Sequence, residues 1–599
     1  MNCIKLISLL LIQLVVTHQI QIPFDFNGLF SSKDVTRPHY TSVDPQYHPI
    51  DLSQYNDKHV VRIDYSNDPD LGKYLISSPL RGDANVHFAK WSHASNLKTI
   101  DIQIDKESLA KLHEMFPSMS FKVIVGDLAQ KIFETYPSQV NQLNEDPVVA
   151  NELFFKEYRS LETIDAWLDL LQATYPDIIS VEEIGETYEH RKYKVVHFTV
   201  PSSEGNDDHG DRRTVVVSGG IHAREWISTS SVLYSIYALI EFYKNAPDSD
   251  IWSKLDFIFI PVSNPDGYEY TWTTDRLWRK NRQPTIHPKC FGIDIDHSYD
   301  YHWTRSSDWA CGEEYSGEAP FEAFESQIWT EYLNNTNANH KIWGYIDLHS
   351  YSQEILYPYA FSCNEQPRDE ENLLEVAWGL AKAIRMQSGT SYNVLPACID
   401  RDADLMPDLG SGTALDYMYH HRADYAFQLK LRDTGNHGFL LPAKYIEPVG
   451  REVVAALKIG KGLMVLVGIT TTDTEDDIAK LSKKLLSLRV FEDLSEPPQT
   501  ATKWYGKPWA KSIVDIQGEI LSVSQFTLYG TVKKGTKPDF HRAAKGHHAV
   551  ELYNKLLEQL RAGLGQEKVK DGEFGAMMDV ALVNDGPVTI VWDTQDSSL

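Results

Sequence analysis

Four largely apolar segments between residues 156 and 457 constrain the fold more than any other feature of this sequence. They read RTVVVSGG, LDFIFIPVSNPDGY, KIWGYIDLHS and DYAFQLKLRDT, and helical patterns such as SSVLYSIYALIEFYK lie between them. Strands with so few polar residues are typical of a sheet that helices cover on both faces. The pattern therefore predicts an α/β domain over residues 156–457.

Other patterns flank this domain, as expected for 599 residues, which are too many for one hydrophobic core. Residues 59–139 alternate strand and helix patterns and predict a small α+β domain. Residues 20–58 are polar and are expected to be poorly ordered, and residues 140–155 are expected to form a linker. From residue 458, strand patterns such as GLMVLVGI and amphipathic helix patterns such as HAVELYNKLLEQLRA indicate a further α/β domain to residue 599.

The first 19 residues have the pattern of a signal peptide. Lys5 precedes an apolar run from Leu6 to Val16, which is too short to favour a membrane span. A buried first strand or helix is the alternative. No later stretch is apolar enough to cross a bilayer, so we expect a secreted protein without a membrane span.

The cysteines and a sequon fit a secreted chain. Outside the signal, an even set of four cysteines predicts two disulfides, and three pairings are possible: Cys290, Cys311, Cys363 and Cys398. Short loops favour 290–311 and 363–398. Four reduced, buried thiols are the alternative if the signal interpretation is wrong. The NNT sequence at Asn334 is a glycosylation sequon.

Three residues at predicted strand ends form a candidate metal site. His222 and Glu225 follow one strand in SGGIHAREW, and His349 ends another in IDLHS. Two imidazoles and one carboxylate suit zinc, and three protein ligands leave a fourth position open. Sites gather at strand ends in α/β sheets. The alternative is a solvated ion pair and an unrelated structural histidine.

Four segments carry a family resemblance: IHAREW, NPDGYEYTWTTDRLWRKNR, DLHSYSQEILYPYA and LRDTGNHGFLLPA. Together they resemble the zinc carboxypeptidases of the pancreatic A/B type. The resemblance implies a mixed, twisted sheet, one zinc ion on His222, Glu225 and His349, and a ferredoxin-like inhibitory pro-segment over 59–139. It also matches Cys290 and Cys311 to the family's common disulfide. It assigns supporting roles to Asp294, which would orient a ligating imidazole, to Arg224, Arg276 and Arg279 in the substrate cleft, and to Leu415 at the specificity position.

The departures from that family bear on its chemistry. Lys430 occupies the position of the glutamate base, and an ammonium has donors but no acceptor. Asp296, His297 and Asp408 replace the Asn-Arg pair and the tyrosine that hold the peptide's terminal carboxylate. These substitutions resemble a fungal branch of inactive, secreted or vacuolar carboxypeptidase-like proteins linked to cell-wall organisation. We predict a zinc-binding pseudoenzyme with an unidentified protein or peptide partner; the alternative is an active zinc carboxypeptidase that releases apolar C-terminal residues.

The C-terminal region resembles a second family. SQFTLYG, KPDFHRAA and FGAMMDVALVNDGPVTI resemble the D-aminoacyl-tRNA deacylases. By this resemblance Ser524, Gln525, Phe526 and Thr527 line a site, and a cis Gly586-Pro587 bond enters the partner subunit of a homodimer. Phe540 would pack on the terminal adenosine of tRNA, and five basic residues could meet its phosphates: Lys533, Lys534, Lys537, Arg542 and Lys545.

The formal net charge of −27 argues against general nucleic-acid binding by the chain as a whole. Two observations oppose deacylase activity in particular. That family's opening strand and following hairpin are missing, because the chain enters IGKGLMVLVGI directly from the preceding helix. A signal peptide would also send the chain away from the cytoplasm, where such a module by itself belongs. Two joined neighbouring genes are our hypothesis, and a working deacylase of D-aminoacyl-tRNA is the alternative.

Overall fold

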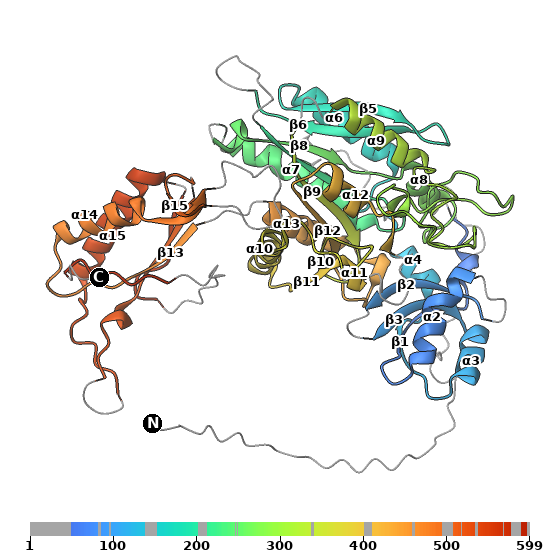
Figure 1. The fold of residues 1–599 in the computed structure, drawn as a ribbon, viewed down its shortest axis with the longest axis horizontal. Coiled ribbons are helices and arrows are strands. Elements are labelled where there is room, and N and C mark those ends of the chain that lie inside the picture. Colours follow the sequence, from blue (N-terminus) through green and yellow to red (C-terminus); the bar gives the residue numbers. More distant parts are fainter. Residues whose placement is uncertain are drawn as a thin grey trace, which may run out of the picture.

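The structure is a computed structural model, and it describes most of the chain in three units (Figure 1). The described residues are 50–81, 86–94, 98–137, 153–201, 212–245, 247, 250–336, 341–400, 410–457, 462–493, 507–516, 518–532, 537–566, 568–576 and 589–595. The predicted signal peptide lies outside them. None of the described helices is both long enough and apolar enough to traverse a lipid bilayer.

The first unit has the predicted ferredoxin-like fold. Its elements are η1 (Leu52–Tyr55), β1 (Lys58–Asp64), α2 (Pro69–Arg81), β2 (Phe88–Ala94), β3 (Thr99–Asp105), α3 (Lys106–Met115), β4 (Ser120–Val125) and α4 (Leu128–Phe133). The four strands pair antiparallel in the order β2-β3-β1-β4. Among the described strands, β2 pairs with β3 alone, so its other edge can face the second unit.

The second unit contains the mixed sheet that the resemblance implied, with eight strands in the order β11-β10-β12-β9-β7-β8-β6-β5. Its strands are β5 (Ile179–Glu186), β6 (Lys192–Phe198), β7 (Arg213–Gly219), β8 (Leu255–Ile260), β9 (Lys341–Ser350), β10 (Glu354–Tyr357), β11 (Asn393–Pro396) and β12 (Tyr425–Leu431). The central strand β7 is buried at every residue after Arg213. Burial of successive side chains requires cover on both faces of the sheet.

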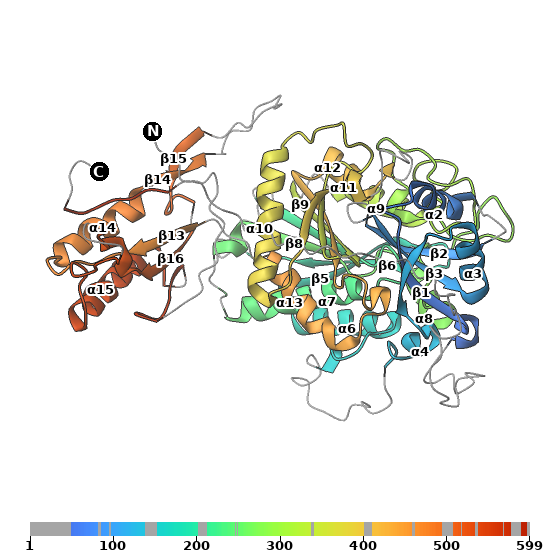
Figure 2. The same ribbon diagram turned by 90° about the horizontal axis from the view of Figure 1, so that it is seen from below.

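Helices provide that cover. They are α6 (Leu161–Thr174), α7 (Trp226–Asn245), α8 (Pro265–Thr273), α9 (Phe324–Thr336), α10 (Glu370–Ser388), α11 (Ala397–Asp400), α12 (Ala414–His421) and α13 (Ile446–Leu457), with short 3-10 turns η5 (Asp250–Ser253), η6 (Ile295–His297), η8 (Gly438–Leu440) and η9 (Ala443–Tyr445). Ser160 caps the start of helix α6, and its hydroxyl accepts a hydrogen bond from the backbone N–H of Thr163. Helix α13 packs against both α7 and α10, and Figure 2 shows these three helices together.

The first two units share one hydrophobic core. Trp91, Leu128 and Tyr136 from the first unit belong to the same cluster of buried side chains as the carboxypeptidase sheet. Tyr136 lies edge-on to Trp226 with ring centroids 5.4 Å apart. Burial of apolar surface is the main favourable term in folding, so the first unit is packed against the second rather than tethered to it.

Two predictions of weak order are wrong at their ends. Residues 50–58 were expected to be poorly ordered, but Leu52 and Tyr55 are buried in the shared core, and the Tyr55 hydroxyl donates to Asp275. Phe154 and Phe155, expected in a linker, are also buried there, and Phe154 stacks on Trp167 at 4.6 Å. In both segments, the buried apolar residues lie within a mainly polar sequence, and their burial gives these ends a fixed place in the core. Residues 138–152 lie outside the described part.

The third unit stands apart from the other two in both views (Figures 1 and 2). It comprises β13 (Gly462–Val467), α14 (Glu475–Ser487), β14 (Arg489–Asp493), β15 (Lys507–Ser512), β16 (Glu519–Ser524), η10 (Phe526–Tyr529), α15 (His547–Leu564) and β17 (Val569–Asp571). A parallel sheet, β13-β16-β17, packs on α14 and α15. The strand predicted over EILSVSQFTLYG stops at Ser524, and η10 follows it.

Gly435 fits the interface between the first two units so closely that a methyl group has no room. Its φ is +100°, and an added Cβ would lie 1.9 Å from Arg62 Nη2. Arg62 binds Asp101 through two 2.7 Å hydrogen bonds and donates to the Thr434 carbonyl at 2.9 Å. Gly435→Ala should therefore lower the free energy of unfolding by about 2–4 kcal/mol, measured by denaturant titration.

A matched control is available in Gly389→Ala. Gly389 has a φ of +75°, but among the described residues no atom beyond its chain neighbours lies within 4 Å of an added Cβ, so only backbone strain of about 1 kcal/mol is expected. Equal losses in the two variants would contradict the close approach at Gly435.

Candidate metal centre

The structure brings the three predicted metal ligands together. His222 and Glu225 lie between β7 and α7, His349 lies in β9, and all three are buried. Glu225 is 3.0 Å from His222 Nδ1 through one carboxylate oxygen and 3.2 Å from His349 Nδ1 through the other. The possible ligand atoms all lie within 4.8 Å of one another. This donor set fits a zinc ion with an open fourth position.

The parallel strands fix this geometry. β7 and β9 are neighbours in register, so the chain leaving β7 at Gly219 meets the end of β9. The backbone N–H of Ser350 donates to Glu225 at 2.9 Å and holds its carboxylate in place. Burial alone would raise the pKa of Glu225, but His222 and His349 hold it well below its usual value.

A buried carboxylate stands behind each imidazole. His222 Nε2 lies 3.1 Å from Asp294, as the resemblance implied, and His349 Nε2 lies 3.0 Å from Asp347. Such partners fix the ring orientation and raise the basicity of the ligand nitrogen. Burial opposes a charged imidazole, but Asp347 and Glu225 outweigh it and raise the pKa of His349 to about 10.

Sequence reasoning missed Asp347 and Gln428. Gln428 of β12 places its amide nitrogen 2.8 Å from His349 Nε2. Asp347 precedes His349 by two residues in one strand, so the two side chains share a face. The D-L-H spacing thus carried a signal for Asp347, whereas nothing local marked Gln428, which reaches His349 from a different strand.

Arg279 contacts the metal ligand His222 and the carboxylate of Asp294 that orients it. Its guanidinium donates to Asp294 at 2.8 Å and lies 3.3 Å from His222 Nδ1. Asp294 is fully buried; burial would raise its pKa, but Arg279 and His222 hold it well below the usual value. Arg279 therefore compensates the buried carboxylate that orients His222.

Lys430 lies on the same face of the sheet as the metal ligands. It is the register partner of His349 in β9, and Gln428, two residues earlier, contacts His349. Its ammonium lies 4.0 Å from Glu354, its register partner in β10. Glu354 lies in β10, one strand further from β9 than Lys430.

The other predicted cleft residues are enclosed. His297 Nδ1 is 3.0 Å from the Ser411 carbonyl, and Asp296 and Leu415 are buried. Arg224 is 2% exposed and donates to Glu313. Asp408 lies outside the described residues.

Arg276, which the resemblance assigns to the substrate cleft, is enclosed like Arg224. Arg276 is 0% exposed and donates to the carbonyls of Arg224 and Phe439. Its guanidinium lies 3.6 Å from the Trp226 ring centroid. Burial lowers the pKa of Arg276 to about 10. It supports packing between the first two units.

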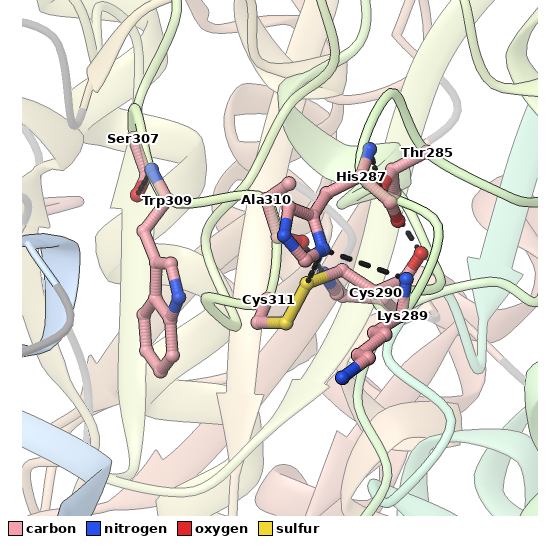
Figure 3. The surroundings of a disulfide bond; sticks show 9 residues. Thr285, His287, Lys289, Cys290, Ser307, Trp309, Ala310 and Cys311 are labelled. Atoms are coloured by element: carbon pink, nitrogen blue, oxygen red, sulfur yellow. Dashed lines mark hydrogen bonds between the residues drawn. A yellow bond between two sulfur atoms is a disulfide. The ribbon is translucent and has the colours of Figure 1, made fainter.

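Both predicted disulfides are present. Cys290–Cys311 and Cys363–Cys398 have Cα separations of 4.7 and 5.3 Å. Figure 3 shows His287 beside the first, with Nδ1 3.4 Å from Cys290 Sγ. Because these sulfurs are bonded to each other, the His287–Cys290–Cys311 cluster offers no thiolates for a metal. Asn334 is exposed on α9 and accepts a hydrogen bond from Arg422.

In the third unit, the predicted residues surround the end of β16. Ser524 ends that strand, Gln525 donates its N–H to the Val467 carbonyl at 2.8 Å, and Phe526 and Thr527 lie in η10. Phe540 meets Phe526 with ring centroids 5.1 Å apart. Lys537, Arg542 and Lys545 are exposed. The remaining predicted residues lie outside the described part: Lys533, Lys534, Gly586 and Pro587.

The fold and the His–Glu–His cluster define a protein of the metallocarboxypeptidase class. The zinc carboxypeptidase family matches residues 164–456, and the D-Tyr-tRNA(Tyr) deacylase family matches residues 448–593. The inactive metallocarboxypeptidase ECM14 of Saccharomyces cerevisiae is 49% identical over 407 residues, which cover 67% of this chain and 91% of that protein. This chain belongs to the zinc carboxypeptidase family, and its last unit is a domain of the deacylase type.

Solved structures agree with the fold. Thrombin-activatable fibrinolysis inhibitor aligns with this chain with a TM-score of 0.57 at 26% sequence identity. The alignment covers 67% of this chain and 97% of the inhibitor chain. Carboxypeptidase A from Helicoverpa armigera has a TM-score of 0.58 at 23% identity, with coverage of 67% and 96%, and shares the fold.

Asp347→Asn should weaken zinc binding by about 10- to 100-fold, because it removes the carboxylate behind His349. Chelator competition at pH 7 measures the change. Asp300→Asn serves as the control, since the Asp300 side chain is 48% exposed and lies 3.9 Å from His421 Nε2, away from the metal ligands. Equal zinc affinity in Asp347→Asn and wild type would show that Asp347 does not support the ligand.

Proposed function

We propose that the second unit is a zinc-binding pseudoenzyme, a carboxypeptidase fold that keeps its metal and has lost peptide hydrolysis. His222, Glu225 and His349 would hold the ion. When bound, zinc would supply a Lewis acid and a structural cross-link between the β7–α7 segment and β9. The curated relative at 49% identity is named inactive, which supports the proposal.

One observation carries it: Lys430 lies where a proton acceptor is required. Hydrolysis by this class of site needs a base within hydrogen-bond reach of the attacking water. A charged Lys430 offers donors and no acceptor, and its ammonium lies 4.0 Å from the Glu354 carboxylate. The lysine therefore neither accepts the proton nor supplies negative charge.

The residues at the carboxylate-anchoring positions give independent support. A peptide's terminal carboxylate is normally held by cationic or amide donors. Asp296 is buried at one of these positions, and His297 Nδ1 lies 3.0 Å from the Ser411 carbonyl. A carboxyl group in place of an amide removes a donor, and its ionised form would repel the terminal carboxylate, so binding is impaired as well as chemistry.

Secretion or delivery to a vacuole, glycosylation at Asn334 and a role in cell-wall organisation complete the proposal. The two disulfides support an oxidising compartment. The partner would be a protein or peptide, because a fold that no longer cleaves can still bind.

For the third unit we propose a deacylase-like domain without a working site. The family match begins at residue 448, but residues 446–457 form helix α13 of the second unit. The opening strand of a deacylase is therefore not supplied by this segment. Binding of tRNA and formation of a homodimer remain expectations from the family resemblance.

Purified full-length protein should release no C-terminal residues from short peptides, before or after mild proteolysis that removes the first unit. Lys430→Glu alone should restore little peptide hydrolysis, because the residues that bind the terminal carboxylate are still missing. The triple variant Lys430→Glu/Asp296→Asn/His297→Arg should hydrolyse peptides at least about 100-fold faster than the background rate seen with wild type. Peptide hydrolysis and zinc content are measured on the same samples. Zinc-dependent wild-type turnover that Lys430→Met abolishes would contradict the proposal.

Full-length protein should not accelerate hydrolysis of D-tyrosyl-tRNA beyond the uncatalysed rate. Acid-precipitable radiolabelled D-tyrosine measures the ester that remains. Hydrolysis that is lost in Thr527→Ala would establish a working deacylase instead.

A single transcript across residues 450–465 would show that the second and third units are encoded together, and it would contradict the joined-gene hypothesis.

A further inference from the structure

Strand β13 forms one edge of the sheet in the third unit. Among the described strands it pairs with β16 alone, in the order β13-β16-β17. At its end, the carbonyl of Val467 accepts a hydrogen bond from the N–H of Gln525, which follows β16. Successive residues of a strand direct their backbone groups to opposite sides. Met464 and Leu466 therefore direct their N–H and carbonyl groups away from β16, along the outer edge of the sheet.

The sequence of β13 contains nothing that discourages pairing with another strand. It reads GLMVLV, with neither a charged residue nor a proline. Strands β2, β14 and β15 contain charged residues. The other edge strands of the described sheets carry a charge or a proline: Lys122 in β4, Glu182 in β5, Pro396 in β11 and Lys570 in β17. Such residues protect an edge from pairing with a further strand, and β13 lacks them.

The two faces of β13 differ in their surroundings. Val467 is buried in the core that the sheet shares with α14 and α15, and Leu463 and Val465 pack against that core. Because side chains alternate along a strand, Met464 and Leu466 lie on the opposite face. Leu466 is 45% exposed. An added strand would satisfy the edge backbone groups and cover this leucine together.

We propose that β13 pairs with β13 of a second copy of this chain, antiparallel and about a twofold axis. Self-pairing of this strand brings no like charges together, whereas self-pairing of β5 would bring its glutamates together. The pairing is isologous, so it closes as a dimer. It differs from the homodimer that the deacylase resemblance implies, because it does not use Gly586 or Pro587.

Backbone direction and side-chain size set the register of this pair. Only Met464, Leu466 and Gly462 direct backbone groups outward, so these residues must lie opposite one another. With Val465 opposite Val465 of the second copy, Met464 lies opposite Leu466 and covers it. The register shifted by one residue in each strand would instead place Leu466 opposite Gly462, which has no side chain to cover it.

A charge swap on full-length protein tests both the pairing and its register. A six-residue pairing is smaller than a standard interface, so wild type should sediment as a dimer at about 100 µM and as a monomer at about 1 µM. Met464→Lys/Leu466→Lys places lysine opposite lysine and should raise the Kd at least about 100-fold. Met464→Lys/Leu466→Glu places lysine opposite glutamate and should restore the Kd to within about tenfold of wild type. The two variants are matched, because each introduces two charges at the same positions.

Cross-linking locates the pair independently. Val465→Cys places two thiols opposite each other at a position without inter-strand hydrogen bonds, where Cα atoms are about 4.5 Å apart. Mild oxidation should therefore give an intermolecular disulfide. Lys570→Cys, in the opposite edge strand β17, is the control and should not cross-link. Wild type oxidised in the same way accounts for the native cysteines.

Three results would overturn the proposal: a wild-type monomer at about 100 µM; a dimer that responds equally to the Lys/Lys and Lys/Glu variants; or equal cross-linking of Val465→Cys and Lys570→Cys. Hydrogen exchange identifies the other possible occupant. A monomer in which the amides of Met464 and Leu466 exchange slowly would have this edge covered by another segment of the same chain.

Discussion

The carboxylate of Glu225, held between His222 and His349, is the interaction on which the site depends. Uncompensated buried charges are costly, so each charge here requires a partner of opposite sign. Glu225 contacts both imidazoles, each imidazole has a carboxylate behind it, and Arg279 compensates Asp294. Loss of one member would leave its neighbours unpaired, which couples the strand ends that carry them.

Lys430, like the charged groups around Glu225, has a partner of opposite charge. Lys430 faces Glu354 across neighbouring strands, so its charge is balanced within the sheet rather than by the metal ligands. A lysine at this position is therefore compatible with the His–Glu–His cluster on the same sheet.

Local patterns predicted the strands, the ligands and both disulfides, because apolar runs and short spacings are written in contiguous sequence. Long-range contacts were not predictable in this way. The role of Arg276 depends on Trp226 and on the first unit packed beside it, and Gln428 meets His349 from another strand. Residues 50–58 were expected to be poorly ordered because their polar composition concealed Leu52 and Tyr55, which are buried only in the assembled core.

Both family matches include part of helix α13, and the contacts of this helix show to which domain it belongs. Glu452 on this helix is 0% exposed and binds Arg432 at the end of β12, while Val449 and Val453 are buried against the second unit. To become the opening strand of a deacylase, the segment would have to expose these valines and leave Arg432 without its carboxylate, at a cost of several kcal/mol. The helix therefore belongs to the carboxypeptidase fold. β13, which pairs only with β16, is left as an edge strand of the third unit's described sheet.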